Sequence, residues 1–180
     1  MVKMIDLCVV NYNTKDLLKR FLDSLHSDLT DQNRIWNIYL SDNGSSDGSW
    51  EWIEQNRLSY QITAGWNNEN IGYSLACNGM ATYGSGDIIC LLNADVWLTT
   101  KDLMDVQKIF DENQDIHILG PKQRDENGFI THAGIVGTNT APKHRGWKQH
   151  DPNDTLFRDR VECVTVSDQH ILLEDQYGQH

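Results

Sequence analysis

Strand-like and helix-like patterns of apolar residues alternate along the first 112 residues of the chain. Leu18, Phe21 and Leu25 recur at i, i+3 and i+7, which predicts an apolar stripe on one face of a helix. Short apolar runs bounded by turn residues predict strands. Together these patterns predict strands at 5–11, 35–41, 59–63 and 87–92, and helices at 15–26, 47–57, 70–83 and 99–112.

The repeated order of strand then helix predicts an α/β fold with a mostly parallel sheet flanked by helices. Right-handed crossovers place such strands side by side, and ligands bind at their carboxyl ends. The unbroken apolar run from Ile88 to Leu92 is typical of a strand buried on both faces. We therefore expect residues 87–92 to form the central strand of the sheet.

Polar residues mark the starts of two of the predicted helices. Thr14 directly precedes the first helix and is a candidate N-cap. Thr99 stands three residues before Asp102, which is the spacing of a capping box.

The segment directly after the predicted central strand permits two interpretations. Asn93 and Asp95 stand on either side of the small Ala94, and Asn and Asp are ordinary turn formers. A carboxylate and an amide on a slim backbone can also form a platform for a metal ion and a phosphate. The order of the preceding segments favours the platform, because it places these residues at the ligand-binding edge of a parallel sheet.

Beyond residue 113 the regular alternation of strand and helix stops. Residues 116–120 predict a strand, and residues 125–130 predict a hairpin turn that leads into another strand. Residues 138–158 have no apolar period and predict a long loop, whereas 161–173 predict a last strand or two. With no internal repeat or clear linker, residues 1–180 are expected to form a single domain.

Composition and charge restrict the function classes. The 180 residues are 39% hydrophobic and carry a formal net charge of −11, which argues against a general nucleic-acid binder. No apolar stretch reaches the length of a membrane span, and the N-terminal residues predict a first strand instead of a signal peptide. The four cysteines are widely spaced, with no zinc or disulfide pattern. We expect a cytoplasmic protein.

With its segments placed in this order, the sequence resembles the family 2 glycosyltransferases. Four stretches carry the resemblance, and the rhamnosyltransferase-like branch is the most similar in its motifs. The likeness extends over about residues 4–135 and implies the GT-A fold, with residues 1–112 as the half that binds a nucleotide-sugar donor and 113–180 as the acceptor side. The four stretches are Val9–Asn13, Leu40–Ser49, Asn70–Asn78 and Leu91–Asp95.

The resemblance implies a set of residues that bind the donor nucleotide. Backbone groups at the end of the first strand would bind the base, and the carboxylate of Asp42 would accept a hydrogen bond from the base or the ribose. Asn43 would brace its loop; the alternative for both residues is an Asx turn with a helix cap. Asn70 would bind the nucleotide or simply cap a helix. The implied donor-binding residues are Val10, Asn11, Asp42, Asn43, Asn70, Gly72, Asn93 and Ala94.

The resemblance also implies a divalent cation, Mg²⁺ or Mn²⁺, that binds the donor diphosphate. Asp95 matches the last carboxylate of the family's DxD-type motif, whereas Asn93 replaces the first, so the metal affinity is expected to be modest. His144 is a candidate for a further metal ligand, with a solvated loop histidine as the alternative. Arg145, next to it, is a candidate phosphate contact.

The family chemistry is an inverting displacement in which a carboxylate acts as general base on the acceptor hydroxyl. The family's segment before that base matches 164–170 poorly, and Asp168 is the candidate base. Glu174 and Asp175 only imitate the family's acidic pair, and a truncated chain that lacks its base is the alternative.

These expectations define a glycosyltransferase that moves a hexose or deoxyhexose from a nucleotide-diphosphate sugar to a saccharide, a lipid carrier or another hydroxyl. The alternative is a non-catalytic nucleotide-sugar-binding module, or one subunit of a larger glycosyltransferase. A homo-oligomer or a partner subunit is compatible with either. A sugar-nucleotide pyrophosphorylase is disfavoured, because no Gly-rich loop with a basic residue follows the first strand.

Overall fold

The computed structural model describes residues 3–26, 34–121, 123–125, 127, 129–132, 135–138 and 141–144. These residues fall into two compact units that divide between Glu112 and Asn113, and each unit is described by itself. None of the described helices is both long and apolar enough to cross a membrane.

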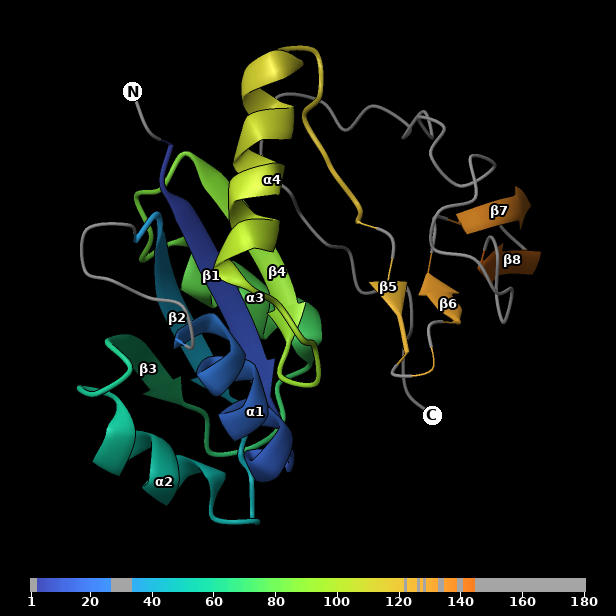
Figure 1. Ribbon diagram of the computed structural model, residues 1–180. Coiled ribbons are helices and arrows are strands. Elements are labelled where there is room, and N and C mark those ends of the chain that lie inside the picture. Colours follow the sequence, from blue (N-terminus) through green and yellow to red (C-terminus); the bar gives the residue numbers. More distant parts are fainter. Residues whose placement is uncertain are drawn as a thin grey trace. The chain divides into compact units, whose positions relative to one another are not determined.

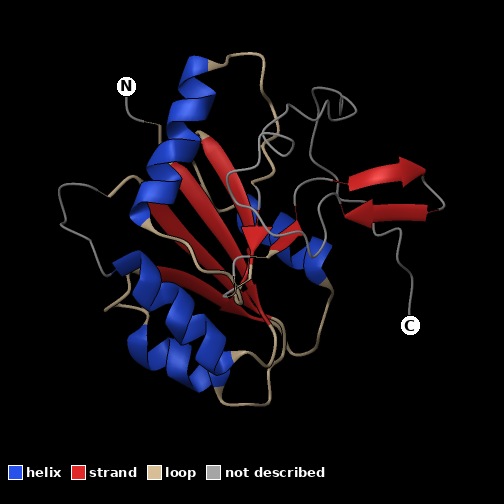
Figure 2. Ribbon diagram, turned by 45° about the vertical axis from the view of Figure 1, so that its right-hand side comes forward, coloured by secondary structure: helices blue, strands red, loops and turns tan. Residues whose placement is uncertain are grey.

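The first unit is a parallel sheet with helices on both faces (Figures 1 and 2). Its four described strands lie in the order β3-β2-β1-β4, and all neighbouring pairs are parallel. The prediction of an α/β fold with a parallel sheet is thus confirmed. In chain order the elements are β1 (Ile5–Asn11), α1 (Lys15–His26), β2 (Trp36–Asp42), α2 (Ser49–Asn56), β3 (Ile62–Trp66), α3 (Tyr73–Ala81), β4 (Ile88–Asn93) and α4 (Thr100–Glu112).

Alternate side chains of β1 enter two separate apolar cores. Ile5, Leu7 and Val9 pack into the larger core, which the apolar faces of α1, α2 and α4 complete. Cys8 and Val10 point to the other face, where they pack with Ala76, Cys77 and Met80 of α3. This period of two explains why every residue of β1 is buried, since side chains on both faces of an inner strand are covered.

Among the described strands, residues 87–92 lie at one end of the sheet order and not in the middle, where the sequence predicted them. Among the described strands, β4 pairs only with β1 and lies at the edge of the sheet, so β1 and β2 occupy its middle. Ile89 on β4 is 44% exposed, in contrast to β1, whose residues are all buried. The apolar run of β4 is long enough for an inner strand, but strand order depends on partners that local sequence does not reveal.

The start of β4 is fixed against the start of β1. The backbone N–H groups of Asp87 and Ile88 both donate to the carbonyl of Met4. Asp6, a buried carboxylate on β1, accepts from Gly86 N at 2.6 Å and from Asn37 Nδ2 at 2.9 Å. A Cβ at Gly86 would lie 2.7 Å from Asp6 Cγ, so glycine is required for this close approach.

The predicted strand at 59–63 is displaced by three residues, because β3 spans Ile62–Trp66. Helix α2 ends in further turns, in which Arg57 N donates to Ile53 O and Tyr60 N to Asn56 O. Gln61 then adopts a left-handed conformation, with φ 53°, that separates these turns from the strand. A left-handed Gln could not be anticipated, because that conformation favours glycine and asparagine.

The second unit contains two antiparallel pairs of short strands, β5 (Gln123–Arg124) with β6 (Ile130–His132) and β7 (Ile135–Thr138) with β8 (Ala141–His144). The turn predicted at 125–130 is confirmed: Asp125 Oδ1 accepts from the backbone N–H groups of Asn127 and Phe129.

Two predictions for this unit are wrong. Residues 116–120 form no strand, because Ile116 N turns back to Asn113 O and none of the described strands pairs with the segment. The predicted loop at 138–158 begins with the end of β7 and all of β8, whose backbone ladder forms without an apolar period. The remainder of that predicted loop and the strand predicted at 161–173 lie outside the described residues.

Candidate active site

A buried hydrogen-bond cluster joins the carboxyl ends of β1 and β2. Asn11 Nδ2 donates to Asp42 Oδ2 at 2.7 Å, and both residues have no exposed surface. Ser45 donates to the same carboxylate twice, from its backbone N–H at 2.9 Å and from its hydroxyl at 2.8 Å. Both carboxylate oxygens of Asp42 therefore accept hydrogen bonds that fix the loop after β2.

Helix α1 receives its N-terminal cap from a distant loop. Lys15 N, in the first turn of the helix, donates to Asp47 Oδ2 at 2.9 Å. Thr14, the predicted N-cap, instead donates its hydroxyl to Asn11 Oδ1 at 2.8 Å. Burial raises the pKa of Asp47, but hydrogen bonds from the Ser49 hydroxyl and from the backbone of Lys15 and Ser49 outweigh it and lower the pKa overall.

The capping box predicted at the start of α4 is confirmed, since Asp102 and Thr99 bond reciprocally.

A chain of three asparagine amides connects the loop after β2 to the start of α3. Asn67 Nδ2 donates to Asn43 Oδ1 at 2.8 Å, and Asn43 Nδ2 donates to Asn70 Oδ1 and to the carbonyl of Gly72, both at 3.2 Å. Gly72 N donates back to Asn70 Oδ1 at 2.9 Å. Gly72 has φ 86°, which suits glycine, and its N–H faces Asn70 while its carbonyl faces Asn43.

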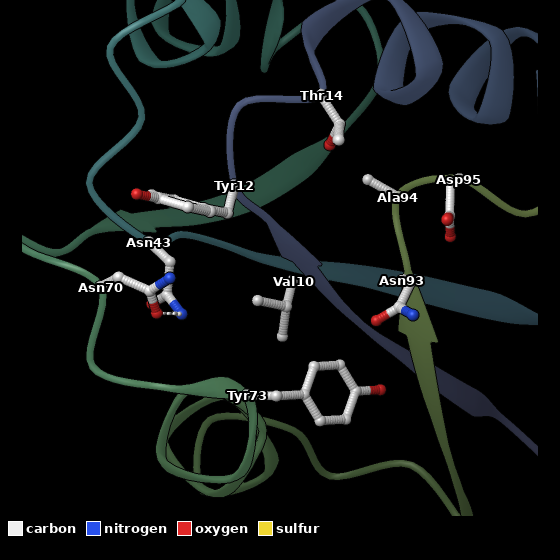
Figure 3. Close-up of a pocket in the computed structure, with 9 residues that line it drawn as sticks. All are labelled: Val10, Tyr12, Thr14, Asn43, Asn70, Tyr73, Asn93, Ala94 and Asp95. Carbon is white, nitrogen blue, oxygen red and sulfur yellow. Dashed lines mark hydrogen bonds between the residues drawn. The ribbon is translucent and has the colours of Figure 1, made fainter. Parts of the chain in front are cut away.

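These loops surround a pocket of about 220 Å³ at the carboxyl edge of the sheet (Figure 3). Figure 3 shows Val10 at its centre, the two amides of Asn43 and Asn70 on one side, and the end of β4 on the other. Tyr73 projects from the start of α3 toward Asn93. The lining residues are Val10, Tyr12, Thr14, Asn43, Asn70, Tyr73, Asn93, Ala94 and Asp95.

Six of the residues predicted to bind donor or metal come together in this lining. They originate from four segments separated by up to 85 positions in the sequence, and the parallel sheet brings them to one edge. The six are Val10, Asn43, Asn70, Asn93, Ala94 and Asp95.

Asn11, Asp42 and Gly72 stand outside the lining and act on it through other residues. Asp42 is fully buried, so the geometry gives it the bracing role that we expected of Asn43, whereas Asn43 reaches the pocket. His144 ends β8 in the second unit, and Asp168 and Arg145 lie outside the described residues.

Sequence reasoning missed three of the lining residues, Tyr12, Thr14 and Tyr73. Each lies within three residues of a predicted site residue. The two tyrosines are also exposed: the exposed fraction is 47% for Tyr12 and 39% for Tyr73. An aromatic residue next to a strand end is the signal that could have revealed them, because it offers a stacking face for a planar ligand. Burial raises the pKa of Tyr73 well above its ordinary value, so its hydroxyl stays protonated.

The lining contains one carboxylate, Asp95, and no lysine or arginine. Within the described residues no group of three His, Cys, Asp or Glu side chains comes together as a ready metal site. Mg²⁺ typically takes one or two carboxylates plus substrate phosphates and water, so a single exposed carboxylate fits a cation that is shared with a bound ligand. The site therefore suits a metal–phosphate complex better than a free metal ion.

An open parallel sheet with a polar pocket at its carboxyl edge defines an α/β protein of the Rossmann-like class. Within that class, the sequence profile of glycosyl transferase family 2 matches residues 6–164. The chain belongs to this family, and the family resemblance of its four motifs is confirmed.

Known proteins place the chain among GT-A folds. It is 25% identical over 161 residues to the abequosyltransferase RfbV of Salmonella typhimurium, covering 88% of this chain and 45% of RfbV. TarS of S. aureus in complex with UDP matches with a TM-score of 0.55 and 18% identity, over 67% of this chain and 38% of TarS. TarS in complex with UDP-GlcNAc also matches with a TM-score of 0.55 and 18% identity, over 67% of this chain and 37% of TarS. The chain thus spans less than half the length of these relatives.

Proposed function

We propose that this chain is a glycosyltransferase that moves a sugar from a nucleotide-diphosphate sugar to an acceptor hydroxyl. The observation that carries this proposal is the pocket at the ends of β1 and β4, where amides and one carboxylate converge. Membership of glycosyl transferase family 2 supports it, as does the fold shared with TarS, whose structures hold UDP and UDP-GlcNAc.

The pocket is suited to the neutral part of such a donor. It has no cationic side chain, and its polar groups are amides, hydroxyls and a single carboxylate. Pockets that enclose a whole ligand are commonly about 300–1,000 Å³. The pocket here is smaller, about 220 Å³, so it would take the base and ribose, with the diphosphate toward Asp95. Val10, Asn43, Asn70, Asn93 and Ala94 are the proposed donor contacts, held in place by Asn11, Asp42 and Gly72.

Asp95 is the proposed ligand of Mg²⁺ or Mn²⁺. Its carboxylate is exposed at the pocket, and neither a hydrogen bond nor an ion pair to another described residue engages it. When bound, the cation would offset the charge of the leaving diphosphate. His144 remains a proposed further ligand, which the second unit would have to supply.

In the proposed transfer the acceptor oxygen forms a bond to the anomeric carbon while the bond from that carbon to the diphosphate oxygen breaks, with inversion. The acceptor proton passes to a carboxylate base, and Asp168 is the proposed residue. We assign donor binding to residues 1–112 and the acceptor side to 113–180, in one domain. A non-catalytic nucleotide-sugar-binding module is the second candidate, because the described pocket supplies a metal ligand but no second carboxylate.

The test is calorimetry with UDP, CDP, dTDP and GDP in the presence of Mn²⁺, followed by assays of donor hydrolysis and transfer. Binding of at least one nucleotide is expected, with turnover that disappears in Asp168→Asn while binding is retained. Binding without any turnover would favour the non-catalytic module, and no binding of any nucleotide would refute both.

A further inference from the structure

Helix α3 carries no charged side chain on any of its faces. The sequence has no Asp, Glu, Lys or Arg between Glu69 and Asp87, although these four residue types make up 23% of the chain. A surface helix of a globular protein ordinarily has a charged or polar face opposite its apolar face, whereas a helix that is apolar on all sides is buried. The composition of α3 therefore resembles that of a helix covered on more than one side.

Within the described part of the chain, α3 is covered on its inner side. That side packs on β1 in the smaller apolar core, whereas α1, α2 and α4 belong to the larger core on the other face of the sheet (Figure 1). On the outer side Leu75 is 63% exposed, and Tyr83, in the turn that follows the helix, is 76% exposed. The outer side thus presents two large apolar side chains to solvent.

Leu75, Gly79 and Tyr83 form one ridge along the outer side, because residues four positions apart lie next to each other on a helix. The turn after the helix continues its path as far as Tyr83, whose N–H donates to Met80 O at 3.0 Å. Gly79, in the middle of the ridge, is exposed, and a Cβ there would have no neighbour within 4 Å beyond its own helix. The ridge therefore has a large residue at each end and a gap in the middle.

The charge of the chain favours a second copy over a membrane as the partner of this ridge. A helix that binds a membrane surface ordinarily carries lysine or arginine on its polar face, and α3 has neither. Each chain has a formal net charge of −11, so two copies repel each other except where their surfaces are uncharged.

The shape of the ridge is suited to a copy of itself. Two crossed helices are closest at the crossing point and diverge on either side of it, so a small residue fits the crossing point and large residues fill the space beyond. A ridge that is large, small and large has this form when it faces itself across a two-fold axis through its middle.

We propose that α3 is the interface of a homodimer, in which two copies of this helix cross at Gly79 about a two-fold axis. Leu75 packs against Tyr83 of the partner subunit, and the axis repeats this contact with the subunits exchanged. Interdigitating ridges of this kind give a crossing angle of about −50°. A single pair of short helices buries less than the roughly 1,200 Å² of a stable interface, so the dimer is weak and dissociates on dilution.

Sedimentation velocity of the full chain between about 1 and 200 µM is the test. The weight-average mass is expected to rise with concentration from that of one chain toward that of two. Leu75→Glu places a carboxylate from each copy in the interface and should raise the dimer dissociation constant at least about ten-fold. Leu58→Glu is the matched control: it is the same substitution at a leucine that is 87% exposed in the turn after α2, and it should leave the constant unchanged.

A pair of opposite charges tests the contact between positions 75 and 83. Tyr83→Lys alone should also weaken the dimer. The double variant with Leu75→Glu and Tyr83→Lys brings opposite charges together across the axis, so it should dimerise more tightly than either single variant. Both side chains are exposed, so the melting temperatures should stay within about 2 °C of that of the parent chain.

A chain that stays monomeric at every concentration would overturn the proposal, as would a dimer that Leu75→Glu weakens no more than Leu58→Glu does. A double variant that dimerises no better than Leu75→Glu would overturn the two-fold pairing. A monomer that floats with phosphatidylcholine vesicles, and loses this binding in Leu75→Glu, would assign the ridge to a membrane instead.

Discussion

Asn11 Nδ2 and Asp42 Oδ2 lie 2.7 Å apart with both residues fully buried, which ties the end of β1 to the end of β2. The carboxylate also holds Ser45, so one charged group organises the loop that leads to Asn43. The pocket depends on this cluster although neither residue of the pair lines it.

Asp42→Ala should lower the free energy of unfolding by about 2–4 kcal/mol, because it leaves the buried amide of Asn11 and the N–H of Ser45 without an acceptor. Urea unfolding measures the change. Asp16→Ala is the control: that carboxylate is 93% exposed, with Lys19 as its 3.6 Å partner, and its loss should cost no more than about 0.5 kcal/mol. Equal losses in both variants would contradict a structural role for Asp42.

Asp95→Ala should act on ligand binding and leave stability unchanged. Its carboxylate is exposed and makes no bond to other described residues, so the melting temperature of the free protein should stay within about 1 °C. The rise in melting temperature that UDP and Mn²⁺ produce together should disappear. A rise as large as that of the parent chain would mean that the cation binds elsewhere.

Asp47 should contribute a stability that depends on pH. Its folded pKa is lowered relative to the unfolded chain, so its contribution is present above the unfolded value of about 3.9 and is lost as the pH falls through the folded pKa. The difference in unfolding free energy between the parent chain and Asp47→Asn should be constant from about pH 5 to 7 and shrink below about pH 4. Ser49→Ala, which removes one hydroxyl donor, should show a smaller acid-dependent loss than the parent chain. A difference that stays flat down to pH 2.5 would refute the assigned hydrogen bonds.

Two glycine substitutions should have opposite effects on stability. Gly79 is an exposed position in α3 with open space where a Cβ would lie, so Gly79→Ala should stabilise the protein by about 0.5–1 kcal/mol. Gly44 has φ 77° and its Cβ would lie 2.9 Å from Glu69 Cα, so Gly44→Ala should destabilise it by about 2 kcal/mol or more. Thermal unfolding separates the two. A neutral Gly44→Ala would show that the loop can move aside.

The pattern of apolar residues predicted most of the first unit because its helices and strands are amphipathic or fully apolar. It did not predict that β4 lies at one end of the described strand order, because strand order depends on contacts between distant segments. It also missed the left-handed Gln61, where a turn after α2 displaced the start of β3. The second unit has strands of two to four residues, too short for a period to be recognised.

The site was predictable as a set of strand ends but not as a hydrogen-bond network. The family motifs identified Asn43, Asn70 and Asp95, and all three line the pocket. Which polar residue is buried and which faces the ligand depends on loops about 30 residues apart in sequence, as with Asn11 and Asp42. No local pattern contains that information, so the roles of Asp42 and Asn43 could not be separated beforehand.

The hydrogen bond from Gly86 N to Asp6, called the clamp below, fixes the start of β4 at the end of the sheet opposite the pocket. From Gly86 the chain runs seven positions, roughly 23 Å, to Asn93 at the end of β4, which lies beside Val10 at the ligand edge. Because side chains alternate along a strand, a slip of one position at the clamp would turn Asn93 to the opposite face of the sheet. Substitutions near Gly86 can therefore disable the site from the opposite end of β4, and a search for inactive variants should include them.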